Sequence, residues 1–360
     1  MANFLDKLTN KLDKSKAFKF SEIDAFEDVK SWVTTGSPYL DYSLKTYGYP
    51  TGIIECRGPS QSGKTTLSLH ACKSTIDQYK DKAVVVILSS ERRDNREVAE
   101  TIGLDLDRVL IVRTGTLEEA FNVVSRTVEA VTEDFGLDAR IFFILDSLGN
   151  TVSSQEKDAL KTRKEARLKG DDTKHAAMGS AARAISLGLR GLVSLLDENE
   201  FTFFMINRAY DKIGSVGKSS YGGTAVEFYP TMRLDLRRKE GLKVGDDEVG
   251  QITIVQPIKT DFDRPKQKFE IEIGYGYGIV LGALDIELGI KLGVLEKFGA
   301  NGAKFNEKLK WKSRRELYQH YEDGNPMLKI LLKKLTSKAH EQVLKERNER
   351  KEQRRNRNKK

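Results

Sequence analysis

The stretch GIIECRGPSQSGKTTLSLHACK, residues 52–73, decides the fold of this chain. It begins as an apolar strand, passes through a loop that contains two glycines, and continues as a helical pattern. Gly58, four further residues and then Gly63, Lys64 and Thr65 match the phosphate-loop pattern. Because the pattern lies between a strand and a helix, as it must to function, we predict a nucleoside triphosphate site at the start of this helix.

Each residue type in this loop has a physical reason. Glycines let backbone N–H groups turn inward around phosphates, and the N-terminus of the helix adds a favourable dipole. Lys64 is expected to reach the terminal phosphates, and Thr65 to coordinate Mg²⁺. The predicted nucleotide-binding residues are Gly58, Pro59, Ser60, Gln61, Ser62, Gly63, Lys64, Thr65 and Thr66.

Short apolar strands alternate with helical stretches over most of the chain, which predicts a mostly parallel sheet with helices on both faces. The predicted strands are Gly52–Cys56, Ala83–Leu88, Arg108–Val112, Arg140–Asp146, Phe201–Asn207, Met232–Arg237, Gln251–Ile258 and Lys268–Ile273. The predicted helices are Thr65–Tyr79, Glu97–Ile102, Leu117–Glu133 and Met178–Asp197. The last three strands have no helices between them, so we expect them to form an antiparallel extension.

A length of 360 residues suits one large α/β domain with small appendages. We predict a short N-terminal helix at Phe4–Leu12 within a segment 1–31, and a core at 32–279. A small C-terminal α/β domain at 280–344 and a basic, disordered tail at 345–360 complete the predicted organisation.

The positive charge is concentrated in that tail. The chain has a net charge of +8, of which residues 345–360 carry +6, so the body is nearly neutral. Such a tail is either a solubilising end or an electrostatic arm for phosphates, and the sequence leaves both interpretations open.

Two cysteines, Cys56 and Cys72, lack metal-type spacing and lie in apolar surroundings, which predicts buried free thiols in a reducing compartment. The apolar runs are far shorter than the roughly 20 residues of a membrane-spanning helix. The N-terminal sequence MANFLDKLTNKLDK has neither the apolar core nor the cleavage site of a signal peptide. We therefore expect a soluble intracellular protein with no membrane partner.

Polar side chains end three of the predicted strands. Asp146 follows IFFIL and is placed to bind Mg²⁺ together with Thr65. Glu91 follows the strand of VVVILSSER and is placed to polarise the water that attacks the γ-phosphate. Asn207 and Arg208 end the strand of FTFFMINR, where they can sense the γ-phosphate, although solvated strand ends would look the same.

Two long loops leave strands on the nucleotide side. One is SSQEKDALKTRKEARLKGDDTKHAA, before Met178, and the other is RAYDKIGSVGKSSYGGTAVEF, after Asn207. Loops of this length within a compact domain are usually functional. The first is rich in lysine and arginine, and the second in glycine. This composition favours a binding surface whose state depends on the nucleotide over two loops that are merely exposed to solvent.

Across Trp32 to Leu335 the sequence resembles the RecA-type recombinases, a family with bacterial and phage (UvsX-like) members. The resemblance rests on several separate motifs in the same order. These are TTGSPYLDYSL, GPSQSGKTT, ILDSLG, MGSAARAISLGLRGL, YGGTAVEFYPTMRLDLRR and LDIELGIKLGVLEKFGA.

The resemblance implies a DNA-dependent ATPase that uses ATP and Mg²⁺ and acts in the cytoplasm of a bacterium or of a phage-infected cell. Protomers are expected to assemble head to tail into a helical filament on single-stranded DNA, pair it with a homologous duplex and exchange strands. Single-strand-binding and mediator proteins are the implied protein partners. Glu91, Lys64 and Arg208 become the catalytic residues, and Asp146 joins the ATP-binding set. The implied DNA-binding residues are Met178, Gly179, Arg183, Ser186, Arg190, Ile213, Gly222, Gly223 and Thr224.

The sequence departs from the family pattern in several places. Arg208 stands where a glutamine senses the γ-phosphate, and Val98 stands where an aromatic ring would stack on adenine. The first DNA loop is longer and more basic, and the tail is basic where the bacterial one is acidic. Lys259 lies near the place where, in the family, lysines reach a neighbouring protomer's ATP.

Two other functions remain open. A hexameric helicase shares the ATPase core, although the motifs of the second loop and the C-terminal domain argue against it. A structural or regulatory DNA filament without strand exchange is the other, since Arg208 alters the coupling to the nucleotide.

Overall fold

The computed structural model describes residue 29 and residues 31–90, 96–136, 138–168, 179–211, 218–262 and 267–357. The predicted helix Phe4–Leu12 lies outside this part of the chain. In the described residues, no helix is both long enough and apolar enough to cross a membrane.

Nine strands of the described residues form one sheet, in the order β13-β12-β11-β10-β3-β7-β6-β4-β5. The pairs from β10 to β5 are parallel, and β10 to β13 are joined as antiparallel neighbours, so the predicted sheet and its extension are confirmed. The strands are β3 (Gly52–Arg57), β4 (Ala83–Ser89), β5 (Val109–Arg113), β6 (Arg140–Asp146), β7 (Phe201–Asn207), β10 (Met232–Val244), β11 (Asp247–Thr260), β12 (Phe269–Gly274) and β13 (Gly278–Val280).

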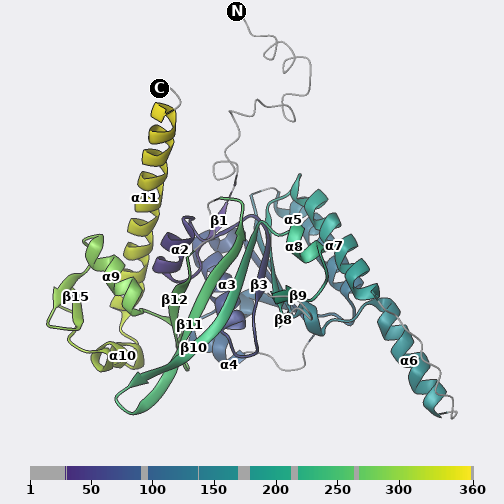
Figure 1. Cartoon of the computed structure of the whole chain (residues 1–360), viewed down its shortest axis with the longest axis horizontal. Coiled ribbons are helices and arrows are strands. Elements are labelled where there is room, and N and C mark those ends of the chain that lie inside the picture. The colour runs from purple at the N-terminus through teal and green to yellow at the C-terminus, as the bar shows by residue number, and fades with distance from the viewer. Residues whose placement is uncertain are drawn as a thin grey trace, which may run out of the picture.

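Helices cover both faces of this sheet (Figure 1). One face carries α2 (Pro38–Leu44), α3 (Lys64–Tyr79) and α4 (Arg96–Thr101), and the other carries α5 (Leu117–Phe135), α7 (Ser180–Leu196) and α8 (Ala225–Phe228). Successive residues of a strand point to opposite faces, so an uninterrupted apolar strand supplies both cores. On β6, Phe142 and Ile144 join the α3 side, whereas Phe143 and Leu145 join the α5 side.

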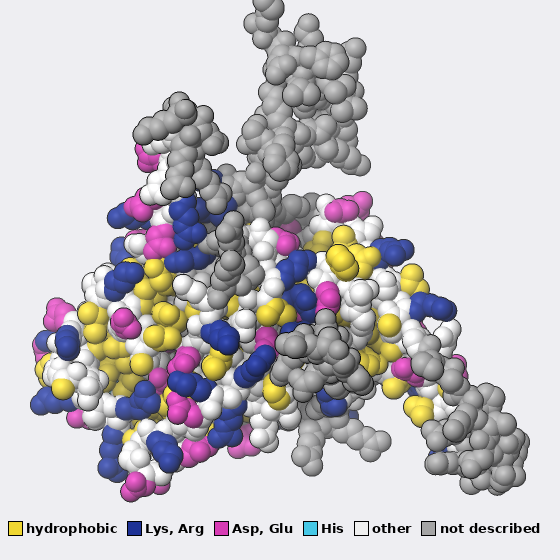
Figure 2. Space-filling view, viewed as in Figure 1, with side chains coloured by type: hydrophobic (Ala, Val, Ile, Leu, Met, Phe, Trp, Pro, Cys, Tyr) yellow, Lys and Arg dark blue, Asp and Glu magenta, His cyan; other side chains and the backbone are white. Residues whose placement is uncertain are grey.

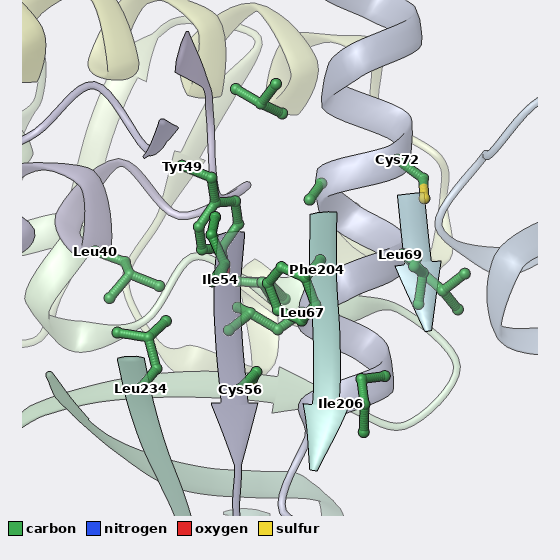
Figure 3. Packing of buried hydrophobic residues seen from close by; sticks show 14 of the residues in the cluster. Leu40, Tyr49, Ile54, Cys56, Leu67, Leu69, Cys72, Phe204, Ile206 and Leu234 are labelled. Atoms are coloured by element: carbon green, nitrogen blue, oxygen red, sulfur yellow. The ribbon is translucent and has the colours of Figure 1, made fainter. Parts of the chain in front are cut away.

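The α3 side of the sheet is tightly packed, as Figure 3 shows for Leu67, Phe204 and their neighbours. Cys56 on β3 and Cys72 on α3 are both buried free thiols in this cluster, as predicted. Burial raises the pKa of both thiols, which keeps them protonated and unreactive.

Short elements connect these layers. They are β1 (Trp32–Val33), β2 (Tyr49–Pro50), β8 (Ala209–Asp211), β9 (Lys218–Ser220) and three 3₁₀ turns at Lys80–Lys82, Leu106–Arg108 and Leu148–Asn150. Strands β8 and β9 pair as an antiparallel ribbon at the base of the second predicted DNA loop.

The first predicted DNA loop is not a loop over its whole length. Residues Ser154–Leu168 form helix α6, which projects from the body in Figure 1. A reciprocal cap starts it, because Ser153 Oγ accepts from the Glu156 amide and a Glu156 carboxylate oxygen accepts from the Ser153 amide. The segment was predicted to be a binding loop, but lysine, glutamate, alanine and arginine are also good helix formers.

The C-terminal part has its own apolar core, which includes Leu281, Trp311, Leu331 and Ala339. Its elements are α9 (Ala283–Lys291), β14 (Glu296–Phe298), β15 (Gly302–Asn306), β16 (Leu309–Trp311), α10 (Arg314–Glu322) and α11 (Pro326–Arg357). The buried carboxylate of Asp285 joins this part to α2, because it accepts from Ser37 Oγ and from the Tyr39 amide.

The predicted disordered tail is wrong for residues 345–357. Helix α11 continues through them to Arg357 (Figure 1). Glu346 anchors this segment to α2, since its carboxylate accepts from Tyr42 Oη and Lys45 Nζ, each at 2.7 Å. Lysine, arginine and glutamate are good helix formers, so a helix that starts on a packed apolar stripe can continue through a basic segment.

Candidate nucleotide site and nucleic-acid interface

The predicted phosphate loop connects β3 to α3, at the carboxyl edge of the parallel strands. A Cβ atom at Gly58 would lie 2.2 Å from the carbonyl oxygen of Leu236, so only glycine fits there. Gly63 has φ +88, and a Cβ there would lie 2.4 Å from Ile273 Cδ1. Gly58 is therefore required by the close approach of the β10 backbone, and Gly63 by its left-handed φ.

Lys64 is the first residue of α3, and its ammonium turns back into the loop. Its Nζ donates to the carbonyl oxygens of Gly58, at 3.1 Å, and Pro59. Burial lowers the pKa of Lys64, while the nearby charge of Asp146 opposes this shift. The ammonium is thus held at the centre of the loop, where the phosphates of a nucleotide would lie.

Thr65 and Asp146 meet beside the loop, as predicted. Thr65 Oγ1 donates to Asp146 Oδ2 at 3.2 Å, and Asp146 ends β6 in register with Ser89 of β4. No group of three or more histidine, cysteine or acidic side chains that could hold a metal occurs within the described ranges. A hydroxyl and a carboxylate fit Mg²⁺, which usually binds one or two protein oxygens and takes its other ligands from phosphates and water.

A cavity of about 560 Å³ adjoins the loop and is lined by Gln61, Ser62, Gly63, Lys64, Thr65 and Thr66 from the loop side. Val98 of α4 and Tyr275, after β12, line it from the other sides. The sequence reasoning missed Tyr275, whose hydroxyl donates to Glu248 Oε1 at 3.0 Å. The repeated glycines of GYGYG, residues 274–278, were the signal that could have marked this turn.

Of the predicted catalytic residues, Glu91 lies outside the described residues. Arg208 follows β7 and its guanidinium donates to Asn150 Oδ1. Its charge is nevertheless close enough to lower the pKa of Lys64, after the larger effect of burial. Asn207 is fully buried and bonded to Glu55, which explains its polar character without a nucleotide.

Helix α7 presents the predicted DNA-contacting arginines on one exposed stripe. Arg183 and Arg190 are both exposed and seven residues apart, with the half-buried Ser186 close to the same line. Leu187 lies between them and is 60% exposed, a contact candidate that the sequence reasoning missed. Gly179 precedes the helix, whereas Met178 lies outside the described residues.

The exit of the second loop lies beside this helix. Gly222 and Gly223 have φ values of +103 and +73, which favour glycine, and Thr224 precedes α8. A Cβ on Gly222 would lie 3.0 Å from Ile185, and one on Gly223 3.6 Å from Ala182, both on α7. The structure therefore places the glycine pair against α7, the helix that carries the arginine stripe, while Ile213 lies outside the described residues.

Charges of both signs are mixed on the face of the molecule shown in Figure 2. Lys259 donates from Nζ to the carbonyl oxygen of Phe228, whose side chain is 74% exposed. DNA contact would therefore depend on local side chains more than on a uniformly basic surface.

Comparisons with known proteins show the family of the chain. The model of the RecA N-terminal domain matches residues 1–280. The chain is 30% identical over 310 residues to Protein RecA of Chlorobaculum parvum, covering 85% of this chain and 82% of the relative. It is 33% identical over 272 residues to Protein RecA of Streptomyces ambofaciens, covering 74% and 67%, and 30% identical over 302 residues to that of Bacteroides thetaiotaomicron, covering 82% and 84%. The chain belongs to the RecA family, whose members are recombinases of homologous recombination and repair.

Proposed function

We propose that this protein is an ATP-dependent recombinase that forms a helical filament on single-stranded DNA and catalyses homologous pairing and strand exchange. The observation that carries the proposal is the position of the α7 arginine stripe and the Gly222–Gly223 turn. Both lie in the same molecule as a complete phosphate loop, and the turn packs against α7, the helix that carries the stripe.

ATP with Mg²⁺ is the proposed ligand of the phosphate loop. Lys64 would hold the terminal phosphates, and Thr65 with Asp146 would supply protein oxygens for the ion. The phosphate charge of the bound nucleotide can be sensed at the phosphate loop and at the DNA-binding loops. Hydrolysis of the nucleotide would weaken the binding of DNA. Glu91 and Arg208 are the proposed water-polarising and phosphate-sensing residues.

The DNA grip in this proposal comes from phosphate contacts. Arg183 and Arg190 on the exposed stripe can track one strand, and backbone N–H groups at Gly222 and Gly223 can approach phosphates that a side chain would obstruct. Recombination must accept any sequence, and phosphate contacts do not read bases.

We also propose self-association in a head-to-tail filament, with double-stranded DNA as the second substrate. Single-strand-binding and mediator proteins are proposed partners. The relatives come from bacteria, which supports action in the bacterial cytoplasm, or in a phage-infected cell.

The test measures ATP hydrolysis with and without single-stranded DNA, strand exchange between a circular single strand and a homologous linear duplex, and assembly by negative-stain microscopy. We expect DNA-stimulated hydrolysis, joint molecules and helical filaments from the natural chain. Lys64→Ala is the matched control and should abolish the hydrolysis. Closed rings with duplex unwinding would refute the proposal in favour of a helicase, and filaments without exchange would favour a structural role.

A further inference from the structure

A cluster of buried charges lies directly behind the phosphate loop. Glu55 and Arg57 on β3, with Arg233 and Asp235 on β10, are each no more than 7% exposed. Arg233 Nε donates to Glu55 Oε2 at 2.6 Å, and Arg57 Nε donates to Asp235 Oδ1 at 3.1 Å. Two acids and two arginines therefore compensate one another in the interior, where unpaired charges would be very costly.

One hydroxyl joins the two ion pairs. Ser220 Oγ accepts from Arg57 Nη1 at 3.1 Å and from Arg233 Nη2 at 3.0 Å, and Ser220 is 6% exposed. A serine hydroxyl has two acceptor lone pairs, and here both are used by arginines. Ser220 is also the last residue of β9, where the second predicted DNA loop returns to the body.

The same cluster fixes the other strand of that loop's base. Asn207 ends β7, and its amide nitrogen donates to Glu55 Oε1 at 2.8 Å and to the carbonyl oxygen of Tyr221 at 2.9 Å. The carbonyl oxygen of Asn207 in turn accepts from the amide of Gly58, the first glycine of the phosphate loop. Both ends of the second loop are thus bonded to the strand that enters the phosphate loop.

We propose that Ser220 is a positioning residue that couples the phosphate loop to the second loop. A nucleotide that orders the phosphate loop would order the β8–β9 ribbon through Arg57 and Ser220. Coupling of binding free energies is reciprocal, so a ligand on the second loop would strengthen nucleotide binding by the same factor. The part of this inference that concerns DNA rests on the proposed function.

The first measurement does not require DNA. Hydrogen exchange of a peptide covering residues 218–224 is followed with and without a slowly hydrolysed ATP analogue and Mg²⁺. In the natural chain we expect the nucleotide to slow exchange in this segment. In Ser220→Ala we expect that protection to fall by about tenfold, because a hydrogen bond from a charged donor contributes about that factor to an equilibrium.

The second measurement is the ratio of single-stranded DNA affinities with and without the analogue. Ser220→Ala should lower this ratio by a similar factor and be rescued by Ser220→Thr, which keeps the hydroxyl. Ser125→Ala is the matched control, since that hydroxyl bonds to the Phe121 carbonyl within α5, remote in sequence from both loops. Arg57→Met is tested in parallel. In this variant Asp235 still has Arg237 as an ion-pair partner, and we expect the same loss of nucleotide-dependent protection and of the affinity ratio.

The outcomes separate the inference from the proposed function. Unchanged protection in Ser220→Ala, or an unchanged ratio of DNA affinities with and without the analogue, overturns the inference, as does failure of both variants to fold. The inference is also overturned if the nucleotide does not slow hydrogen exchange of the β8–β9 ribbon in the natural chain. Nucleotide-dependent protection that Ser220→Ala removes, in a protein without DNA-stimulated hydrolysis, would sustain the coupling and refute the recombinase proposal.

Discussion

Replacing the two exposed arginines of α7 should change how the protein's DNA affinity responds to salt. Arg183 and Arg190 lie on the same exposed stripe. Arg190 Nε donates to Tyr229 Oη at 3.4 Å, a hydrogen bond that raises the pKa of Arg190 and leaves it a full cation. The double variant Arg183→Ala, Arg190→Ala therefore removes two positive charges without disturbing the buried face of α7.

The size of the effect follows from counterion release. Each phosphate neutralised on a single strand contributes about 0.7 to the slope of log affinity against log salt, so two lost contacts reduce the slope by about 1.4. When salt rises from about 50 to 200 mM, the affinities of both proteins for single-stranded DNA fall. The factor by which the natural chain's affinity falls should be about seven times the factor for the variant. If the two contacts act only through counterion release, the loss of affinity near 100 mM is about 25-fold.

The assay is fluorescence anisotropy of a labelled single-stranded oligonucleotide, with a slowly hydrolysed ATP analogue, over a series of salt concentrations. Arg126→Ala with Arg315→Ala is the matched control, because it removes the same charge from exposed positions on α5 and α10. An unchanged slope in the α7 variant, or an equal reduction in the control, would exclude these arginines from the interface.

Three other changes test separate parts of the structure. Val98→Tyr adds an aromatic ring to the wall of the nucleotide cavity and should tighten ATP binding about two- to tenfold, measured by calorimetry; weaker binding would show that this wall does not face the base. Burial would raise the pKa of Glu346, but hydrogen bonds from Lys45 and Tyr42 outweigh it and lower the pKa from 4.5 to about 2. Because the folded state holds this carboxylate ionised, its contribution, about 1 kcal/mol after allowing for solvent screening, is present above pH 4.5 and lost as the pH falls towards 2. Glu346→Gln should thus lower the free energy of unfolding at pH 7 and lose its effect in acid, and a difference that persists at pH 2 would contradict this assignment. Deleting 351–360 spares Glu346 and should weaken DNA capture at low salt if the segment is an electrostatic arm, whereas unchanged capture would make it a solubilising end.

The central sheet could be predicted because each of its strands is an apolar run between turn signals. Arg140–Asp146 and Phe201–Asn207 were predicted with the observed ends, since burial on both faces requires apolar residues throughout. Strands β10 and β11 extend well beyond their apolar parts. In these extensions the two strands pair through their backbones, and ion pairs such as Arg238 with Glu248 join their side chains. A search for apolar runs cannot detect such charged strands.

The site divides in the same way. The phosphate loop and Asp146 follow from local sequence, because their geometry is set by a strand, a turn and a helix. The bonds of Ser220 with Arg57 and Arg233 join residues up to 163 positions apart, so no local pattern could indicate them. Helix α6 was missed for a different reason, since its composition suits both a charged loop and a helix, and only the reciprocal cap at Ser153 distinguishes the two.

The length of α11 has a practical consequence for experiments on this protein. At a rise of about 1.5 Å per residue, the helix continues about 16 Å beyond Glu346 to Arg357. A fluorophore attached at position 357 through a cysteine substitution would lie away from the nucleotide cavity, at the end of helix α11. If the proposed filament forms, energy transfer between such labels would report the spacing of its protomers, without a probe in either binding site.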